Sequence, residues 1–138
     1  MNNIHVEVLE QAGWRQRTLG RFADRLGPLW TRKEGDTWAY GILATDDHLN
    51  PAGFVHGGVL CALFDHAVSA FAWEATGRRA CVTVQLNTQF ISAARQGQFL
   101  EARGKVVRLA TTLAFVEAGI SSGADELLRG SSVLRIMP

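Results

Sequence analysis

The sequence predicts an α+β protein in which an antiparallel sheet wraps around one long central helix. Residues 58–75 form a run that is apolar nearly all the way round, which is typical of a buried helix. Two strand-like segments precede this run and four follow it, and short turn signals between them favour antiparallel pairing. One apolar helix and one sheet must bury each other's apolar faces, and wrapping the sheet around the helix is the simplest way to do so.

The N-terminal segment, residues 1–25, is predicted to be helical in part. Over residues 4–23 apolar and charged side chains are mixed, and Gly13 interrupts the pattern, so we expect a short or broken helix. The residues expected to line part of one helical face are Val8, Gln11, Trp14 and Leu19.

Two strands and a loop separate this segment from the central helix. Residues 28–34 and 37–45 are rich in Trp, Tyr, Ile and Leu, and the turn signal Gly35-Asp36 between them predicts a β-hairpin. Residues 46–58 are rich in Gly, Asp, Asn and Pro, so we expect a loop that leads into the helix.

The second half of the chain is expected to supply four strands after Gly77, which is placed where a glycine often ends a helix. Residues 80–91 alternate between apolar and polar side chains, as expected of a strand with two different faces. The predicted apolar face holds Val82, Val84, Leu86 and Phe90, and the polar face holds Thr83, Gln85, Asn87 and Gln89. Three further strand-like runs cover 98–108, 111–121 and 127–137.

Length and composition are those of an ordinary globular protein. The chain has 138 residues, which suits one domain over residues 1–138. Apolar residues make up 47% and charged residues 20%, and the formal net charge is +1. This charge gives no general attraction to nucleic acid or to a membrane surface, so neither is expected as a partner. The start of the chain does not resemble a secretory signal, and no apolar run is long enough to span a membrane, so we expect a cytoplasmic location.

The two cysteines and the acidic residues give no sign of a metal site. Cys61 and Cys81 have neither a disulfide framework nor a metal-ligand spacing, and their apolar neighbours predict buried free thiols. The adjacent Asp46, Asp47 and His48 do not provide sound ligand geometry. We therefore expect no metal and no bound cofactor.

The glycines at the start of the predicted helix are the first feature that points to chemistry. Gly57 and Gly58 carry backbone N–H groups that have no partner within the helix. The partial positive charge of a helix N-terminus favours an anion, or an oxygen that becomes one. A thioester carbonyl under attack is such an oxygen, so this segment is a candidate oxyanion site.

Asp65 is the second such feature, because it lies inside an otherwise apolar helix. Burying a carboxylate is costly unless the group is paired or functional. A carboxylate in such a place is a candidate for a shifted pKa, and it can serve as a nucleophile on an acyl carbon or as a general base for water.

The spacing of these two features predicts a dimer. Asp65 follows Gly57 by eight residues, which corresponds to roughly 12 Å along one helix. A carbonyl oxygen held at the Gly57 N–H therefore cannot have its carbon in contact with Asp65 of the same chain. If both groups act on one substrate, Asp65 must come from a second subunit, and two antiparallel helices would create two such sites by symmetry.

The run formed by Asn50, Gly53, His56-Gly57-Gly58 and Asp65 resembles the signature of hotdog-fold acyl-coenzyme A thioesterases. These belong to the 4-hydroxybenzoyl-CoA thioesterase superfamily, and the similarity is strongest to its phenylacetic acid degradation (PaaI-like) branch. Residues 82–87 and 90–92 resemble the next strand of that branch, and the resemblance covers about residues 20–137. The fold that it implies is the hotdog fold, a sheet wrapped around a central helix.

The resemblance also implies roles for individual residues. It implies that Asn50, His56 and Gly57 of one subunit bind the thioester, while Asp65 of the partner subunit performs or assists the attack. Thr83 matches a Ser or Thr position that places the attacking water, although it falls on the polar side of its predicted strand. The resemblance implies an acyl-CoA substrate, a homodimer with shared active sites, and pairing of dimers into a homotetramer.

Gly58 and Arg95 are the expected substrate-binding residues. Gly58 adds a second backbone N–H at the start of the helix, and Arg95 offers a guanidinium to the phosphates of coenzyme A. A solvated surface arginine is the alternative for Arg95.

A structural interpretation stays open for each candidate catalytic residue. Gly57 and Gly58 can simply form a tight turn, and His56 can cap the helix or hold the loop through the backbone. Asn50 before Pro51 can form an Asx turn. Asp65 can be a structural acid that accepts a hydrogen bond from Ser69, one turn further along the helix.

Three functions are compatible with these residues. Hydrolysis of acyl-CoA thioesters uses all of them and ranks first. A non-catalytic acyl-CoA binding module would keep the Gly57 contact without depending on Asp65. Hydration or dehydration of an acyl chain requires a His and an acid as a proton-transfer pair, and it ranks third. The sequence leaves the acyl group open among aromatic, short-chain and medium-chain groups.

Overall fold

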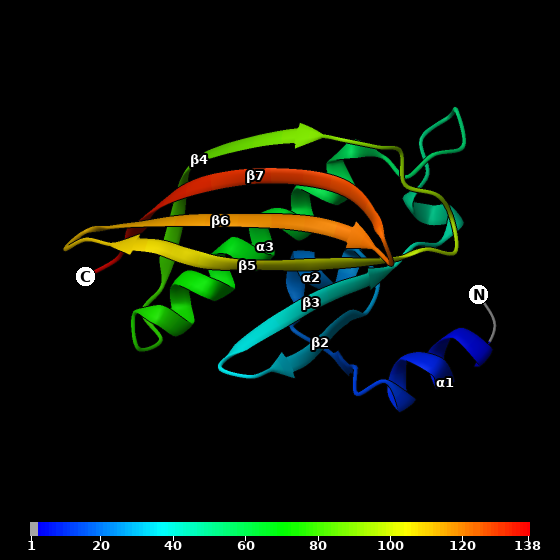
Figure 1. Cartoon of the computed structure of the whole chain (residues 1–138), viewed down its shortest axis with the longest axis horizontal. Helices are drawn as coiled ribbons and strands as arrows, with labels where there is room; N and C mark the ends of the chain where they lie inside the picture. The colour runs from blue at the N-terminus through cyan, green and yellow to red at the C-terminus, as the bar shows by residue number, and fades with distance from the viewer. Residues whose placement is uncertain (1–2) are drawn as a thin grey trace.

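The computed structural model describes residues 3–138 and has the predicted α+β architecture (Figure 1). A seven-stranded antiparallel sheet curves around the long helix α3 (Gly57–Ala75), with strand order β1-β2-β3-β5-β6-β7-β4. The strands are β1 (Arg15–Arg17), β2 (Leu29–Glu34), β3 (Thr37–Leu43), β4 (Cys81–Phe90), β5 (Phe99–Leu109), β6 (Leu113–Ser122) and β7 (Asp125–Ile136). The predicted hairpin over β2 and β3 and the four later strands are confirmed to within a few residues. A left-handed Gly77, with φ of 72°, follows α3 as predicted.

The N-terminal segment is more complex than predicted. Helix α1 (Asn3–Gln11) is followed by the short strand β1 and by α2 (Arg21–Arg25), a helix of five residues. The predicted helical face was wrong, because Val8 and Leu19 are exposed and only Trp14 is buried. The ring of Trp14 packs edge-on against Phe99 with 4.8 Å between ring centroids, so the chain leaves its helical path after α1 to bury this indole.

Helix α3 buries one side and leaves the other partly open. Its buried residues are Leu60, Leu63, Phe64, Ala67, Val68, Phe71 and Ala72. The helix was predicted to be buried all round, but Asp65, His66 and Ser69 are only partly buried in the single chain. The sheet therefore covers one face of α3, and the apolar composition of the remaining face exceeds what the chain itself covers.

Strand β4 lies at one edge of the sheet and contains a β-bulge that changes its faces. It pairs only with β7, and the register shifts between Thr83 and Gln85, which leaves Val84 without a partner. One extra residue inverts the alternation of side chains beyond it. Because of this, Thr83 points inward toward α3 and Val82 and Val84 are exposed, which corrects the predicted apolar face of this strand.

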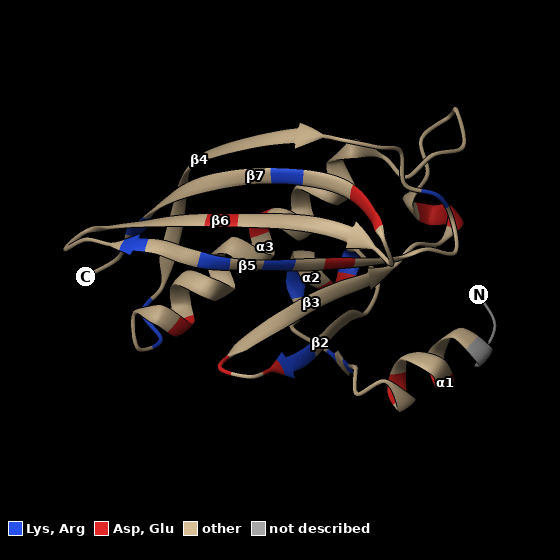
Figure 2. Cartoon of the chain, viewed as in Figure 1, with Lys and Arg blue, Asp and Glu red and all other residues tan. Residues whose placement is uncertain are grey.

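Three further observations concern the surface. Cys61 and Cys81 are free but only half-buried, so the prediction of buried thiols was wrong. Strand β5 carries several Lys and Arg residues, and Asp and Glu residues occur on β5, β6 and β7 (Figure 2). Among residues 3–138, no helix is both long enough and apolar enough to cross a membrane.

Candidate active site

Asp65 and Thr83 form the closest polar contact between α3 and the edge strand. The Thr83 hydroxyl donates a hydrogen bond of 2.6 Å to Oδ1 of Asp65. The alternative partner, Ser69, is not the residue that makes this contact. The Thr83 hydroxyl is a neutral donor that holds one side of the carboxylate. Asp65 is only half-buried in the single chain, so its other side stays accessible. A short hydrogen bond to a charged oxygen fixes the direction in which the other oxygen points.

The accessible side of Asp65 faces a cavity of about 230 Å³ between α3 and α2. Phe22 and Leu26 supply the wall opposite the helix. The sequence did not predict this wall, because a helix of five residues is too short to show a hydrophobic periodicity. The available signals were Gly20 and Gly27, which flank α2 and both adopt positive φ.

The start of α3 carries the two backbone N–H groups that the oxyanion hypothesis concerns, those of Gly57 and Gly58. His56 is the N-cap residue, and its Nδ1 accepts a hydrogen bond of 2.8 Å from the Gly58 N–H. The Gly57 N–H donates to no other group in the described part of the chain. The ring of Phe90 lies against this glycine, since an added Cβ would meet it at 3.3 Å. The helix therefore begins with one engaged N–H and one free N–H.

The loop before α3 is held by Asn50. Its Oδ1 accepts hydrogen bonds from the backbone N–H groups of Ala52 and Phe54, at 3.0 and 3.1 Å. This is the geometry of the Asx turn, which is the structural interpretation of Asn50. At the same end of the molecule, the Arg95 guanidinium stacks over the Phe54 ring at 4.9 Å from its centroid. Arg95 is exposed, and its contact with Phe54 places its charge beside the loop that leads to Gly57.

His48 supports this loop through both of its ring nitrogens. Its Nδ1 accepts from the Thr45 N–H at 3.0 Å, and its Nε2 donates to the Leu26 carbonyl at 2.6 Å. Its own carbonyl accepts from the His56 N–H. The residues that the structure describes contain no group of three His, Cys, Asp or Glu side chains able to hold a metal ion.

The Asp65 cavity adjoins a second cavity, which aromatic residues line. His66, next to Asp65 on α3, packs edge-on against Tyr40 with 5.5 Å between ring centroids. Burial lowers the pKa of His66 against the opposing influence of Asp65, which favours the neutral imidazole. Burial, with a contribution from Glu74, raises the pKa of Tyr40 to about 12. This side of α3 is therefore a low-polarity environment.

The candidate residues fall into two groups within one chain. Asn50, His56, Gly57, Gly58 and Arg95 lie around the start of α3, whereas Asp65 and Thr83 meet two turns further along the helix. The separation between Gly57 and Asp65 remains roughly 12 Å along an uninterrupted helix. One chain thus carries both halves of the predicted chemistry without bringing them together.

Comparison with known proteins places this arrangement in a family. A curated relative from Pseudomonas aeruginosa, named as an esterase, is 32% identical over 115 residues, which cover 82% of this chain and 86% of that protein. The crystal structure of AziG from S. sahachiroi has a TM-score of 0.77 and 27% identity, and covers 87% of this chain and 98% of that one.

Two more distant structures share the fold. A phenylacetic acid degradation-related protein from Ralstonia eutropha has a TM-score of 0.67 and 23% identity over 94% of this chain and 89% of its own. A Streptococcus mutans protein bound to acetyl-CoA has a TM-score of 0.65 and 20% identity over 72% of this chain and 79% of its own. The fold is the hotdog fold that the sequence predicted. The family model for the thioesterase superfamily matches residues 52–128, more than half of the chain, and the protein is therefore a hydrolase of the thioesterase superfamily.

Proposed function

We propose that the protein hydrolyses acyl-CoA thioesters at sites shared between two copies of the chain. The observation that carries this proposal is the pair of half-sites on α3. A free backbone N–H at Gly57 suits a developing oxyanion, and an oriented, accessible carboxylate at Asp65 suits attack or base catalysis. Neither half is complete without the other, and a second antiparallel helix supplies what is missing.

The unpaired edge of the sheet supports a second copy. Strand β4 offers free backbone groups along one side, and Val82 and Val84 are exposed there. An exposed apolar edge strand is rare in a monomer, because it invites pairing with another chain. Pairing at this edge would place the two copies of α3 side by side.

The reaction begins with the thioester carbonyl oxygen at the Gly57 N–H. In one route Asp65 of the partner subunit takes a proton from water, and the water oxygen bonds to the acyl carbon. In the other route the Asp65 carboxylate itself bonds to the acyl carbon, and water then hydrolyses the anhydride. In both routes the negative charge develops on the carbonyl oxygen, and the C–S bond breaks to release coenzyme A as a thiolate. The thiolate takes up a proton from solvent, and in the first route Asp65 returns to solvent the proton that it took from water. Thr83 keeps the Asp65 carboxylate pointing at the reacting atoms.

The other candidate residues lie where the substrate binds. His56 and Asn50 fix the turn that presents Gly57, and Gly58 contributes by donating its N–H to His56. Arg95 lies near this turn, where its guanidinium suits a phosphate of the coenzyme A portion. The Streptococcus mutans relative with acetyl-CoA bound supports coenzyme A as the carrier of the acyl group.

Paired substitutions test the shared site. Gly57→Pro removes the N–H at a helix position that accepts proline, and His56 already has the extended backbone that precedes a proline. We expect turnover of an acyl-CoA to fall by about 10²- to 10³-fold. Gly57→Ala is the matched control, because it adds the same Cβ beside Phe90 but keeps the N–H.

Complementation then decides whether the site is shared. Asp65→Ala alone is expected to abolish turnover while leaving the oligomer folded. A heterodimer of Asp65→Ala and Gly57→Pro chains, isolated through two different tags, would contain one intact site, so activity should return. A heterodimer as inactive as its parents would exclude a shared site. Undiminished activity of Asp65→Ala would exclude the hydrolytic role of Asp65, and acyl-CoA binding without turnover by the wild type would indicate a binding module.

A further inference from the structure

The cavity beside Asp65 adjoins a larger one along the same side of α3. This second cavity has a volume of about 590 Å³, within the range of small-molecule sites, and lies between α3 and the β2–β3 hairpin. The two cavities share Leu29, His66 and Ser69 as lining residues. The larger cavity therefore adjoins the Asp65 cavity on the side toward the C-terminal end of the helix.

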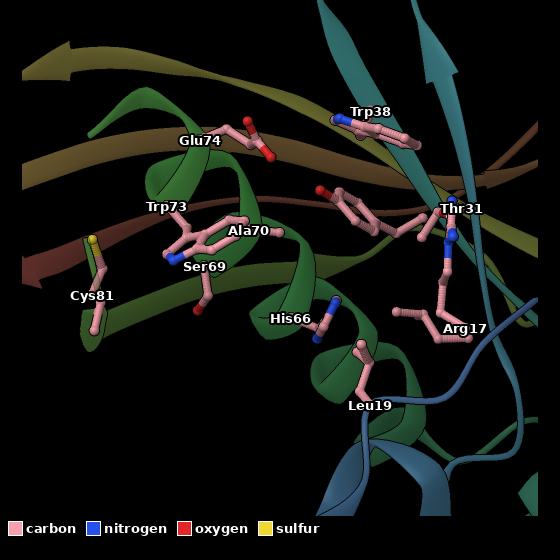
Figure 3. Close-up of a pocket in the computed structure, with 13 residues that line it drawn as sticks. Arg17, Leu19, Thr31, Trp38, His66, Ser69, Ala70, Trp73, Glu74 and Cys81 are labelled. Carbon is pink, nitrogen blue, oxygen red and sulfur yellow. The ribbon is translucent and has the colours of Figure 1, made fainter. Parts of the chain in front are cut away.

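Aromatic and aliphatic side chains form most of the wall of the larger cavity. Trp38 and Leu19 face it from the hairpin and from the segment after β1, and His66, Ser69 and Trp73 project into it from α3 (Figure 3). The raised pKa of Tyr40, which also lines the cavity, agrees with a poorly hydrated interior. Such a wall favours an apolar guest.

Trp73 lines the larger cavity near the C-terminal end of α3, on the side away from Asp65. It follows Asp65 by eight residues on the same face of α3, which corresponds to roughly 12 Å. Trp73 is 40% exposed, so packing in the core does not hold it in place. The Arg78 guanidinium stacks on this indole at 5.2 Å from the ring centroid, and Arg78 adopts φ of 74°, which is uncommon for a residue with a side chain. The Arg78 N–H also donates to the Trp73 carbonyl at 2.7 Å.

We propose that this cavity holds an apolar acyl chain of the thioester and that Trp73, braced by Arg78, sets the longest chain that the protein accepts. The inference rests on the proposed thioester hydrolysis and adds a specificity-determining residue to it. A chain that ends short of the indole gains contact area with each added methylene group. A longer chain meets the ring and must displace it or remain in water.

The test is a chain-length profile measured on the full-length protein. Values of kcat/KM for acetyl-, butanoyl-, octanoyl-, dodecanoyl- and hexadecanoyl-CoA would be compared between the wild type and Trp73→Ala. We expect the variant to gain at least about tenfold on the longest chains that the wild type rejects, and to match the wild type on acetyl-CoA. Ser69→Phe, which fills the cavity one turn before Trp73, should shorten the accepted chain. Val107→Ala, on the outer face of β5, is the control and should keep the wild-type profile.

The outcomes separate this inference from the proposed function. Wild-type protein that releases no thiol from any of these thioesters would refute the hydrolysis and the inference with it. Active wild type with an unchanged profile in a folded Trp73→Ala variant would refute the inference alone. Should Ser69→Phe fail to fold, the Trp73→Ala profile still decides the question.

Discussion

The Thr83 hydroxyl donates a 2.6 Å hydrogen bond to Asp65 across the gap between the edge strand and the central helix. The β-bulge at Val84 allows this contact. Before the bulge the odd-numbered residue Thr83 faces the helix, and after it the even-numbered residues of β4 do. Thr83 is therefore a positioning residue for the carboxylate that we place at the reacting carbonyl.

Replacing Thr83 with valine keeps its shape and removes its hydroxyl. Since a hydrogen bond to a charged group contributes on the order of 1.5–3 kcal/mol, we expect kcat to fall about 10- to 100-fold with little change in KM. Thr83→Ser should restore most of the rate, because it returns the donor. Steady-state kinetics on one acyl-CoA would check this, and a valine variant with wild-type kcat would show that the contact does not support turnover.

The edge of β4 predicts how the chain associates. Val84 is 62% exposed at the bulge, and placing a carboxylate there should oppose pairing of two edges. We expect Val84→Asp to be monomeric at concentrations where the wild type is a dimer or a pair of dimers, and to lose activity together with the dimer. Sedimentation velocity measures this directly.

Val107 provides a matched control for that experiment. It is an exposed valine at the bulge of β5, which is an interior strand of the sheet, and it is 55% exposed. Val107→Asp should leave the oligomeric state unchanged. Dissociation by both variants would locate the interface away from β4 or show a general loss of stability.

His48 should contribute to stability more than its position in a loop suggests. It is buried and joins Thr45 to the end of α2 through its two ring nitrogens. His48→Leu leaves a buried N–H and a buried carbonyl without partners, so we expect the free energy of unfolding to fall by about 2 kcal/mol. Urea denaturation would measure this, with the exposed His5→Leu as the control expected to match the wild type. Equal midpoints for both variants would contradict the proposed role.

An ion-pair network on the sheet predicts a pH-dependent stability. Arg103 donates to both carboxylate oxygens of Glu34, at 2.8 and 2.9 Å, and this lowers the pKa of Glu34 from 4.5 to about 2. Because the folded pKa lies below the unfolded one, the stabilisation is fully present above about pH 4.5 and is lost as the pH falls through about 2.

Glu34→Gln should therefore lower Tm at pH 7 and lose its effect toward pH 2. After allowance for solvent screening, the expected loss at pH 7 is about 1 kcal/mol. Calorimetric melts of the wild type and the variant across this pH range would show the two curves converging. Asp36→Asn, in the exposed turn beside Glu34, serves as the control. A difference in Tm that is independent of pH would assign the effect to packing instead of charge.

Sequence alone determined the elements whose signal is local. The long apolar run predicted α3, the Gly35-Asp36 turn predicted the hairpin, and the eight-residue spacing set Gly57 and Asp65 too far apart to act on one carbonyl within one chain. These features follow from helical rise, turn geometry and side-chain polarity, which neighbouring residues fix without help from the rest of the chain.

Tertiary structure decided the features that depend on distant partners. The bulge that turns Thr83 inward arises from the pairing of β4 with β7. Most of the paired residues are forty or more positions apart in the chain, so no local sequence pattern predicts the bulge. The wall that α2 forms beside Asp65, and the aromatic cavity that Trp73 lines, exist because the hairpin and the N-terminal segment pack over one side of α3. A sequence pattern records which side chains avoid water, but the partner that each of them meets is set by the path of the whole chain.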